Sequence, residues 1–110
     1  MDMRAYAEVK SIMGEVLKEL IETFVDYMPT QLDDLKKAID NKDASLIFGI
    51  AHRIKSSCNS LGALGPAETA QMIEQLGRDN TIESADEHFT ELTLQVNKAI
   101  EFLNKELEGI

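Results

Sequence analysis

Residues 43–66 read DASLIFGIAHRIKSSCNSLGALGP, and their pattern indicates an α-helical fold. Its apolar residues recur at steps of three and four, the spacing that places side chains on one face of an α-helix. They are Ile47, Ile50, Ala51, Ile54, Cys58 and Leu61. Asp43 is suited to cap the start of this helix, and Gly62, Gly65 and Pro66 bracket its end. The stretch therefore predicts one amphipathic helix between two turns.

The same spacing continues upstream of this helix. Apolar side chains from Val16 to Ile39 form one stripe, which predicts a long helix over residues 15–39. Pro29 lies inside it, but the stripe keeps its phase across the proline. We therefore expect a kink just before Pro29 rather than a break. A shorter helix is predicted over residues 3–12.

Two more helices are predicted downstream. Pro66 suits the first turn of a further helix, which runs to about Gly77. Polar residues 79–81 then separate it from a last apolar stripe between Ala85 and Leu107. Four substantial helices with short connections predict an all-α, antiparallel up-and-down four-helix bundle. The extra N-terminal helix is expected to cap one end, and residues 1–110 form a single domain.

Composition narrows the classes of function. The chain has 110 residues, of which 44% are hydrophobic, enough for one core. Acids outnumber bases by 20 to 11, a net charge of −9, which argues against nucleic acid or an anionic membrane as a partner. The apolar runs are too short for a transmembrane helix or a signal peptide. The single Cys excludes an internal disulfide, so we expect a cytoplasmic protein.

His52 is the residue that the helix pattern singles out. At about 100° per residue it lies roughly 140° from Ile47, away from the apolar stripe, so it points to solvent. Lys55 follows one turn later, while Gly49 and Ser56 keep the surrounding surface small. From this geometry alone, an ordinary surface histidine remains the alternative interpretation.

The residues that follow His52 indicate a more specific function. Residues 51–63, AHRIKSSCNSLGA, resemble the signature of histidine-containing phosphotransfer (HPt) domains, in which Ala-His-x-hydrophobic-Lys-Gly precedes small residues and a Leu-Gly-Ala-like turn. The matching residues are Ala51, His52, Ile54, Lys55, Leu61, Gly62 and Ala63. The sequence departs at Ser56, where the family usually has Gly. The flanking helices agree in length and phase, so the resemblance covers nearly the whole chain. It implies a bundle whose His accepts a phosphoryl group from one receiver-domain Asp and passes it to another.

Two side chains are expected to assist His52. Lys55 can neutralise the oxygens of an incoming phosphoryl group. Facing residues around the turn at Gly62 have numbers that sum to about 126, which places Glu74 opposite His52 in an antiparallel pair. Its carboxylate could accept the ring N–H and leave the other nitrogen free. A solvated Glu74 is the alternative, and Gln71 or Gln75 replaces it if the register differs.

A docking patch for the partner is expected around His52. Its predicted members are Phe48, Gly49, Lys55, Ser56 and Asn59, with Gln71 and Gln75 from the next helix. Phe48 leaves the apolar stripe, and it either closes the edge of the bundle or contributes an apolar docking contact. The expected partners are receiver domains of response regulators and of a hybrid sensor kinase.

Other chemistries lack the residues they need. Neither His follows a Glu at the spacing of a di-metal carboxylate bundle, and Cys and His are too few for a zinc site. No glycine-rich loop could hold a nucleotide. We therefore expect a monomeric phosphocarrier without cofactor or metal, and not an enzyme that uses ATP. Met1 and the length favour a free-standing protein. The alternative function is an acidic helical adaptor without phosphotransfer.

Overall fold

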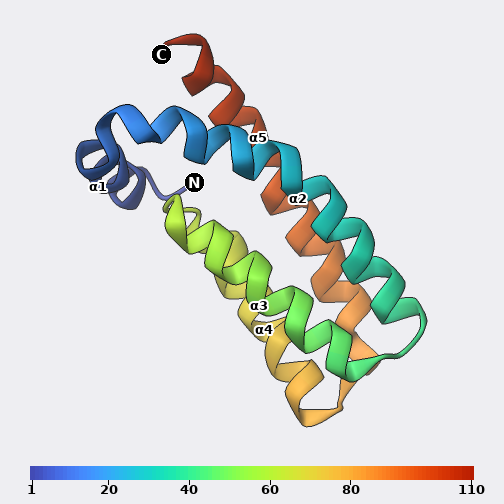
Figure 1. The fold of residues 1–110 in the computed structure, drawn as a ribbon. Helices are drawn as coiled ribbons and strands as arrows, with labels where there is room; N and C mark the ends of the chain where they lie inside the picture. Colours follow the sequence, from blue (N-terminus) through green and yellow to red (C-terminus); the bar gives the residue numbers. More distant parts are fainter.

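The computed structural model describes residues 1–110 as five α-helices and two short 3-10 helices. They are α1 (Met3–Met13), η1 (Gly14–Val16), α2 (Leu17–Asp40), α3 (Ala44–Ser60), α4 (Leu64–Asp79), η2 (Ile82–Ser84) and α5 (Ala85–Glu108). Helices α2 to α5 run up and down as a four-helix bundle, and α1 lies across one end (Figure 1). The predicted fold class is confirmed.

The core is formed by one face of each bundle helix. It contains 24 buried apolar residues, including the whole predicted stripe of α3. Val16 was expected at the start of the α2 stripe, but it is 54% exposed. The reason is that α2 begins only at Leu17, after a 3-10 turn that changes the phase of the preceding residues. Helix α2 is continuous through Pro29, and Figure 1 shows its axis changing direction between its two halves.

The ends of α3 follow from the residues that flank it. The Asp43 side chain accepts a hydrogen bond from the Leu46 backbone N–H at 3.1 Å, as predicted for an N-cap. At the other end Gly62 adopts a φ of 76°, a conformation that favours glycine. Helix α4 then begins at Leu64, and Pro66 lies in its first turn, as predicted.

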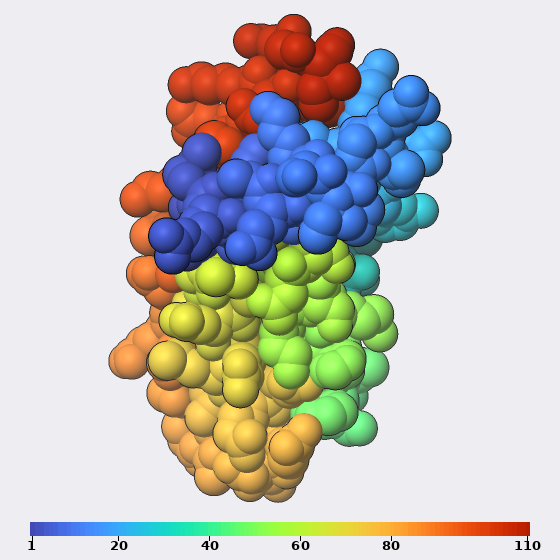
Figure 2. Space-filling model, turned by 90° about the vertical axis from the view of Figure 1, so that its left-hand side faces the viewer, coloured from blue at the N-terminus to red at the C-terminus, as the bar shows by residue number.

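Helix α1 covers the end of the bundle where α3 turns into α4. The Asp2 backbone N–H donates to the Gly62 carbonyl at 3.2 Å, and a Cβ at Gly62 would lie 2.6 Å from the Tyr6 backbone nitrogen. The buried Tyr6 hydroxyl donates to Glu106 on α5 at 2.9 Å. Burial and the Glu106 carboxylate raise the pKa of Tyr6 to about 12. Figure 2 shows α1, in blue, lying over the ends of α3 and α4.

Helices α3 and α4 approach each other closely at Gly77. A Cβ at this position would lie 2.8 Å from both the Ala44 carbonyl oxygen and the Phe48 backbone nitrogen. Both atoms belong to the backbone of α3, so a side chain here could be accommodated only by moving one helix. At Gly49, by contrast, an added Cβ would meet no atom within 4 Å. The two glycines therefore have different physical roles.

This difference predicts opposite effects of alanine at the two positions. Gly77→Ala is expected to lower the free energy of unfolding by about 1–3 kcal/mol, because the added methyl forces two backbones apart. Gly49→Ala is expected to raise it by up to about 1 kcal/mol, since alanine is the better helix former. Urea unfolding followed by circular dichroism measures both. Equal shifts in the two variants contradict the close contact at Gly77.

Candidate functional site

His52 lies in the middle of α3 with its ring directed outward. Its side chain is 54% exposed, and Nδ1 lies 2.6 Å from Oε2 of Glu74 on α4. Nε2 makes no hydrogen bond within the protein. The turn at Gly62 pairs α3 with α4 in the register that the sequence predicted, so this contact is present. The imidazole is thus held at one nitrogen and open at the other.

Glu74 is a buried carboxylate that both Lys55 and His52 contact. Its side chain is 6% exposed, and its second oxygen, Oε1, accepts a hydrogen bond from Lys55 Nζ at 2.7 Å. Burial works to raise the pKa of Glu74. Hydrogen bonds from Lys55 and His52, with their charges, outweigh burial and hold that pKa below its usual range. The alternative of a solvated Glu74 is therefore wrong.

The hydrogen bond to Glu74 determines which ring nitrogen can react. An ionised carboxylate accepts hydrogen bonds and donates none, so Nδ1 of a neutral His52 must carry the proton. The lone pair is then on Nε2, the nitrogen without a partner. Any positive charge that develops on the ring is stabilised by the same carboxylate. The arrangement is that of an oriented nucleophile on an open surface.

Lys55 has a closer partner than the sequence suggested. Lys55 was expected to neutralise the oxygens of an incoming phosphoryl group, and the structure also pairs it with Glu74 and leaves its side chain only 23% exposed. The Lys55 ammonium group therefore lies beside the His52 site but is already paired with the Glu74 carboxylate. Its removal affects both the charge at the site and the partner of a buried carboxylate.

Lys55→Ala is accordingly expected to lower the free energy of unfolding by about 1.5–3 kcal/mol, the range for a hydrogen bond between charged groups. Phosphoryl uptake should also become slower. Thermal unfolding and single-turnover transfer measure the two effects. Lys98→Ala, which removes an exposed lysine from α5, is the control. If both variants are equally stable, the Lys55–Glu74 pair does not contribute to folding.

Phe48 lies one turn before His52 and is half-buried at the edge of the α3–α4 pair. Its ring is stacked on the His52 ring at an interplanar angle of 17° and a centroid distance of 6.3 Å. The Arg78 guanidinium of α4 lies over the Phe48 ring, 5.2 Å from its centroid. The sequence allowed Phe48 either to close the edge of the bundle or to contribute an apolar docking contact. Its position matches the first of these interpretations.

The other predicted docking residues surround His52 without contacting it through hydrogen bonds. Ser56 and Asn59 are exposed on α3, and Gly49 is partly exposed. Gln71 and Gln75 are exposed on α4, where the Gln75 side chain donates to Asp79 at 3.0 Å. Their docking role remains a prediction. The small side chains on α3 leave the approach to Nε2 open.

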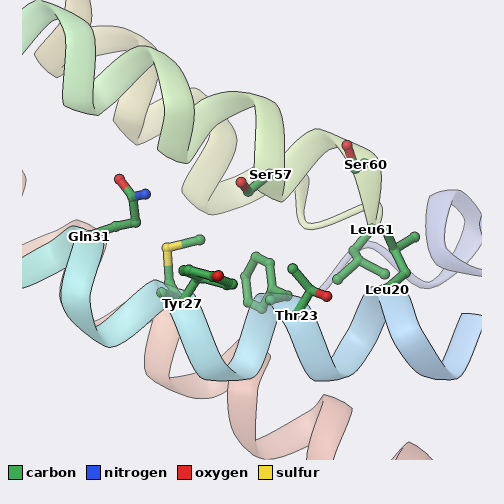
Figure 3. A pocket seen from close by; sticks show the side chains of 9 residues that line it. Leu20, Thr23, Tyr27, Gln31, Ser57, Ser60 and Leu61 are labelled. Carbon is green, nitrogen blue, oxygen red and sulfur yellow. The ribbon is translucent and has the colours of Figure 1, made fainter.

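A groove that the sequence did not reveal lies between α2 and α3 (Figure 3). Its volume is about 210 Å³. Its lining residues are Leu20, Thr23, Phe24, Tyr27, Met28, Gln31, Ser57, Ser60 and Leu61. None of them belongs to the cluster around His52. Such a groove depends on the separation of two helices, which residue spacing does not determine.

Two further findings concern reactivity and membrane insertion. Cys58 is fully buried, and burial raises the pKa of its thiol to about 12, so it has no thiolate character at neutral pH. It fills the core, as predicted. No helix of the chain combines the length and apolarity needed to cross a membrane.

Comparisons with known proteins agree with this fold and identify the family. The model of the Hpt domain family matches residues 19–103, and the chain therefore belongs to this family of histidine phosphotransfer domains. The fold is similar to the crystal structure of histidine-containing phosphotransfer protein B (HptB) from Pseudomonas aeruginosa PAO1, with a TM-score of 0.94 and 21% identity. The match covers 100% of this chain and 96% of that chain. No curated protein matches the sequence significantly.

Proposed function

We propose that this protein is a phosphocarrier of a two-component phosphorelay, in which His52 exchanges a phosphoryl group with the aspartates of receiver domains. The observation that carries the proposal is the His52–Glu74 contact of 2.6 Å on an imidazole that is 54% exposed. It combines an accessible nitrogen lone pair with a buried group that orients the ring. The proposed site thus comprises His52, Glu74 and Lys55.

Transfer begins with attack of Nε2 on the phosphorus of an aspartyl phosphate. The N–P bond forms while the P–O bond to the aspartate breaks, and the aspartate leaves as a carboxylate. The proton on Nδ1 stays in its hydrogen bond to Glu74, so no general base has to remove it. The positive charge gained by the ring is balanced by the Glu74 carboxylate. The reverse sequence delivers the phosphoryl group to a second receiver.

Lys55 contributes positive charge to the same surface. Its Nζ lies 2.7 Å from Glu74 Oε1, and Lys55 follows His52 by one helical turn, so its charge can act on the oxygens of a phosphoryl group on Nε2. Around the ring, the small Gly49 and Ser56 allow a receiver domain to approach, and Asn59, Gln71 and Gln75 supply polar groups for its docking. Ser56 replaces the usual family Gly with a side chain that is still small.

The test uses a panel of purified receiver domains labelled at their aspartates with radioactive phosphate. Incubation with this protein is expected to transfer label from at least one receiver. The label should be acid-labile and alkali-stable, as phosphohistidine is. A second incubation with an unlabelled receiver should remove it again, which establishes a carrier rather than an end point.

The same experiment distinguishes a phosphocarrier from the alternative function of an adaptor. An acidic helical adaptor would bind a receiver without accepting label, and binding measured by calorimetry alongside the transfer assay distinguishes the two. If no receiver labels the protein, or if the label is stable to acid, the phosphocarrier proposal is wrong. A receiver incubated with heat-unfolded protein controls for non-specific labelling.

A further inference from the structure

The Phe48 side chain is held by α4 as well as by its own helix. Gly77 allows the backbone of α3 at Phe48 to come close to α4, because a Cβ there would lie 2.8 Å from the Phe48 nitrogen. The next residue, Arg78, places its guanidinium 5.2 Å from the centroid of the Phe48 ring. A cation over an aromatic face is attractive, so the ring has a preferred plane.

The plane of the Phe48 ring is nearly parallel to that of the imidazole. The Phe48 and His52 rings are inclined by 17°, and their centroids lie 6.3 Å apart, within the distances over which aromatic pairs interact. The two residues are one helical turn apart, where side chains on the same face of a helix meet. The contact is therefore a product of the helix and of the neighbouring Gly77 and Arg78.

The hydrogen bond to Glu74 orients the imidazole but does not hold it rigidly. A single hydrogen bond tolerates a range of distances and angles, so the ring can still rock about its χ2 torsion while Nδ1 stays within reach of the carboxylate. A second surface alongside the ring removes this freedom and determines the direction in which Nε2 points. We propose that Phe48 is a positioning residue, which keeps the His52 ring in the plane where Nε2 faces the phosphoryl donor. This inference rests on the proposed phosphotransfer at His52.

A positioning role and a docking role for Phe48 predict different results when a small phosphoryl donor replaces a receiver domain. Phosphoramidate has no docking surface, and it phosphorylates the imidazole with formation of the N–P bond, breakage of its own P–N bond and loss of ammonia. A residue that only docks a receiver domain does not affect this reaction. A residue that orients the ring affects transfer from phosphoramidate and from a phosphorylated receiver alike.

The experiment compares Phe48→Leu, which keeps apolar volume without a ring, with Phe48→Tyr, which keeps the ring. Leu is expected to slow phosphorylation by both donors about tenfold, since small losses of alignment at a reacting atom are costly. Tyr is expected to restore the rate to within about twofold of the original protein. Leu46→Ala, which removes an exposed apolar side chain from the same helix, is the control and should react normally.

A spectroscopic measurement tests the same inference without phosphotransfer. The NMR chemical shifts of the His52 ring protons should lose the contribution of the neighbouring aromatic ring in Phe48→Leu and retain it in Phe48→Tyr. The χ2 rotamers of His52 should become more evenly populated in Phe48→Leu only. His88 provides the internal reference. Slowing with the receiver alone would assign Phe48 to docking and overturn the inference, as would unchanged His52 rotamers. An unreactive original protein would overturn the phosphocarrier proposal, and the rotamers would still decide whether Phe48 orients the ring.

Discussion

His52→Gln is expected to abolish phosphoryl uptake completely while the bundle remains folded. The His52 side chain is 54% exposed and has Glu74 as its one hydrogen-bond partner, so its loss removes nothing from the core. The Gln amide can still donate a hydrogen bond to Glu74, but it has no lone pair able to attack phosphorus. Label transferred from a phosphorylated receiver measures the effect, and circular dichroism checks the fold.

The matched control is His88→Gln on α5, because His88 is the one other histidine of the chain. It should accept label at the original rate. Together the two variants separate a specific site from general reactivity of imidazoles. Label retained by His52→Gln and lost by His88→Gln would move the site to α5 and refute the assignment.

Glu74→Ala is expected to have the largest effect on stability, lowering the free energy of unfolding by about 3–5 kcal/mol. The substitution removes a buried carboxylate that accepts hydrogen bonds at 2.6 Å from His52 and 2.7 Å from Lys55. It also leaves a cavity between α3 and α4. The His52 ring should then divide between its two tautomers, which the nitrogen chemical shifts of the imidazole report directly.

The pH dependence of this effect follows from the Glu74 pKa. Because the folded protein holds that pKa below its usual value, the carboxylate contributes stability above the unfolded pKa of about 4.3. That contribution is lost as the pH falls through the lower pKa of the folded state. The difference in stability between the original protein and Glu74→Gln should therefore shrink on acidification below about pH 4.3.

Glu68→Ala and Glu68→Gln provide the comparison, since Glu68 is exposed on the same helix and forms no ion pair. Both are expected to stay within about 0.5 kcal/mol of the original protein. If Glu68 and Glu74 variants lose equal stability, the cost belongs to helix α4 in general and not to the His52–Glu74–Lys55 cluster. A Glu74→Gln curve parallel to that of the original protein at low pH would contradict the lowered pKa.

Much of this site could be predicted because it depends on regular geometry. The steps of three and four in α3 determine that Ile54 points inward and His52 outward. The short turn at Gly62 fixes how α3 and α4 pair, and simple counting around it leads from His52 to Glu74. These features follow from the helical repeat and the loop length alone, which the sequence displays.

Other features depend on rotamers and on distances between helices. Lys55 has a long side chain that could have reached solvent. It pairs with Glu74 instead because that carboxylate is buried and needs a partner. The orientation of Phe48 depends on Arg78 and on the closeness of the helices at Gly77. Val16 was misplaced because a 3-10 turn interrupts the repeat by a fraction of a turn. None of these three features can be predicted from the spacing of residues in the sequence.

The proton on Nδ1 has a consequence for the identity of the modified residue. Phosphohistidine exists as two positional isomers, and free histidine in solution gives both. With Nδ1 occupied by its bond to Glu74 at 2.6 Å, only Nε2 is available, so the proposed phosphorylation of His52 is expected to give the τ-isomer alone. Antibodies raised against stable analogues of the τ-isomer should therefore recognise the phosphorylated protein, whereas reagents selective for the π-isomer should not. The position of one buried carboxylate thus predicts which of the two isomers forms.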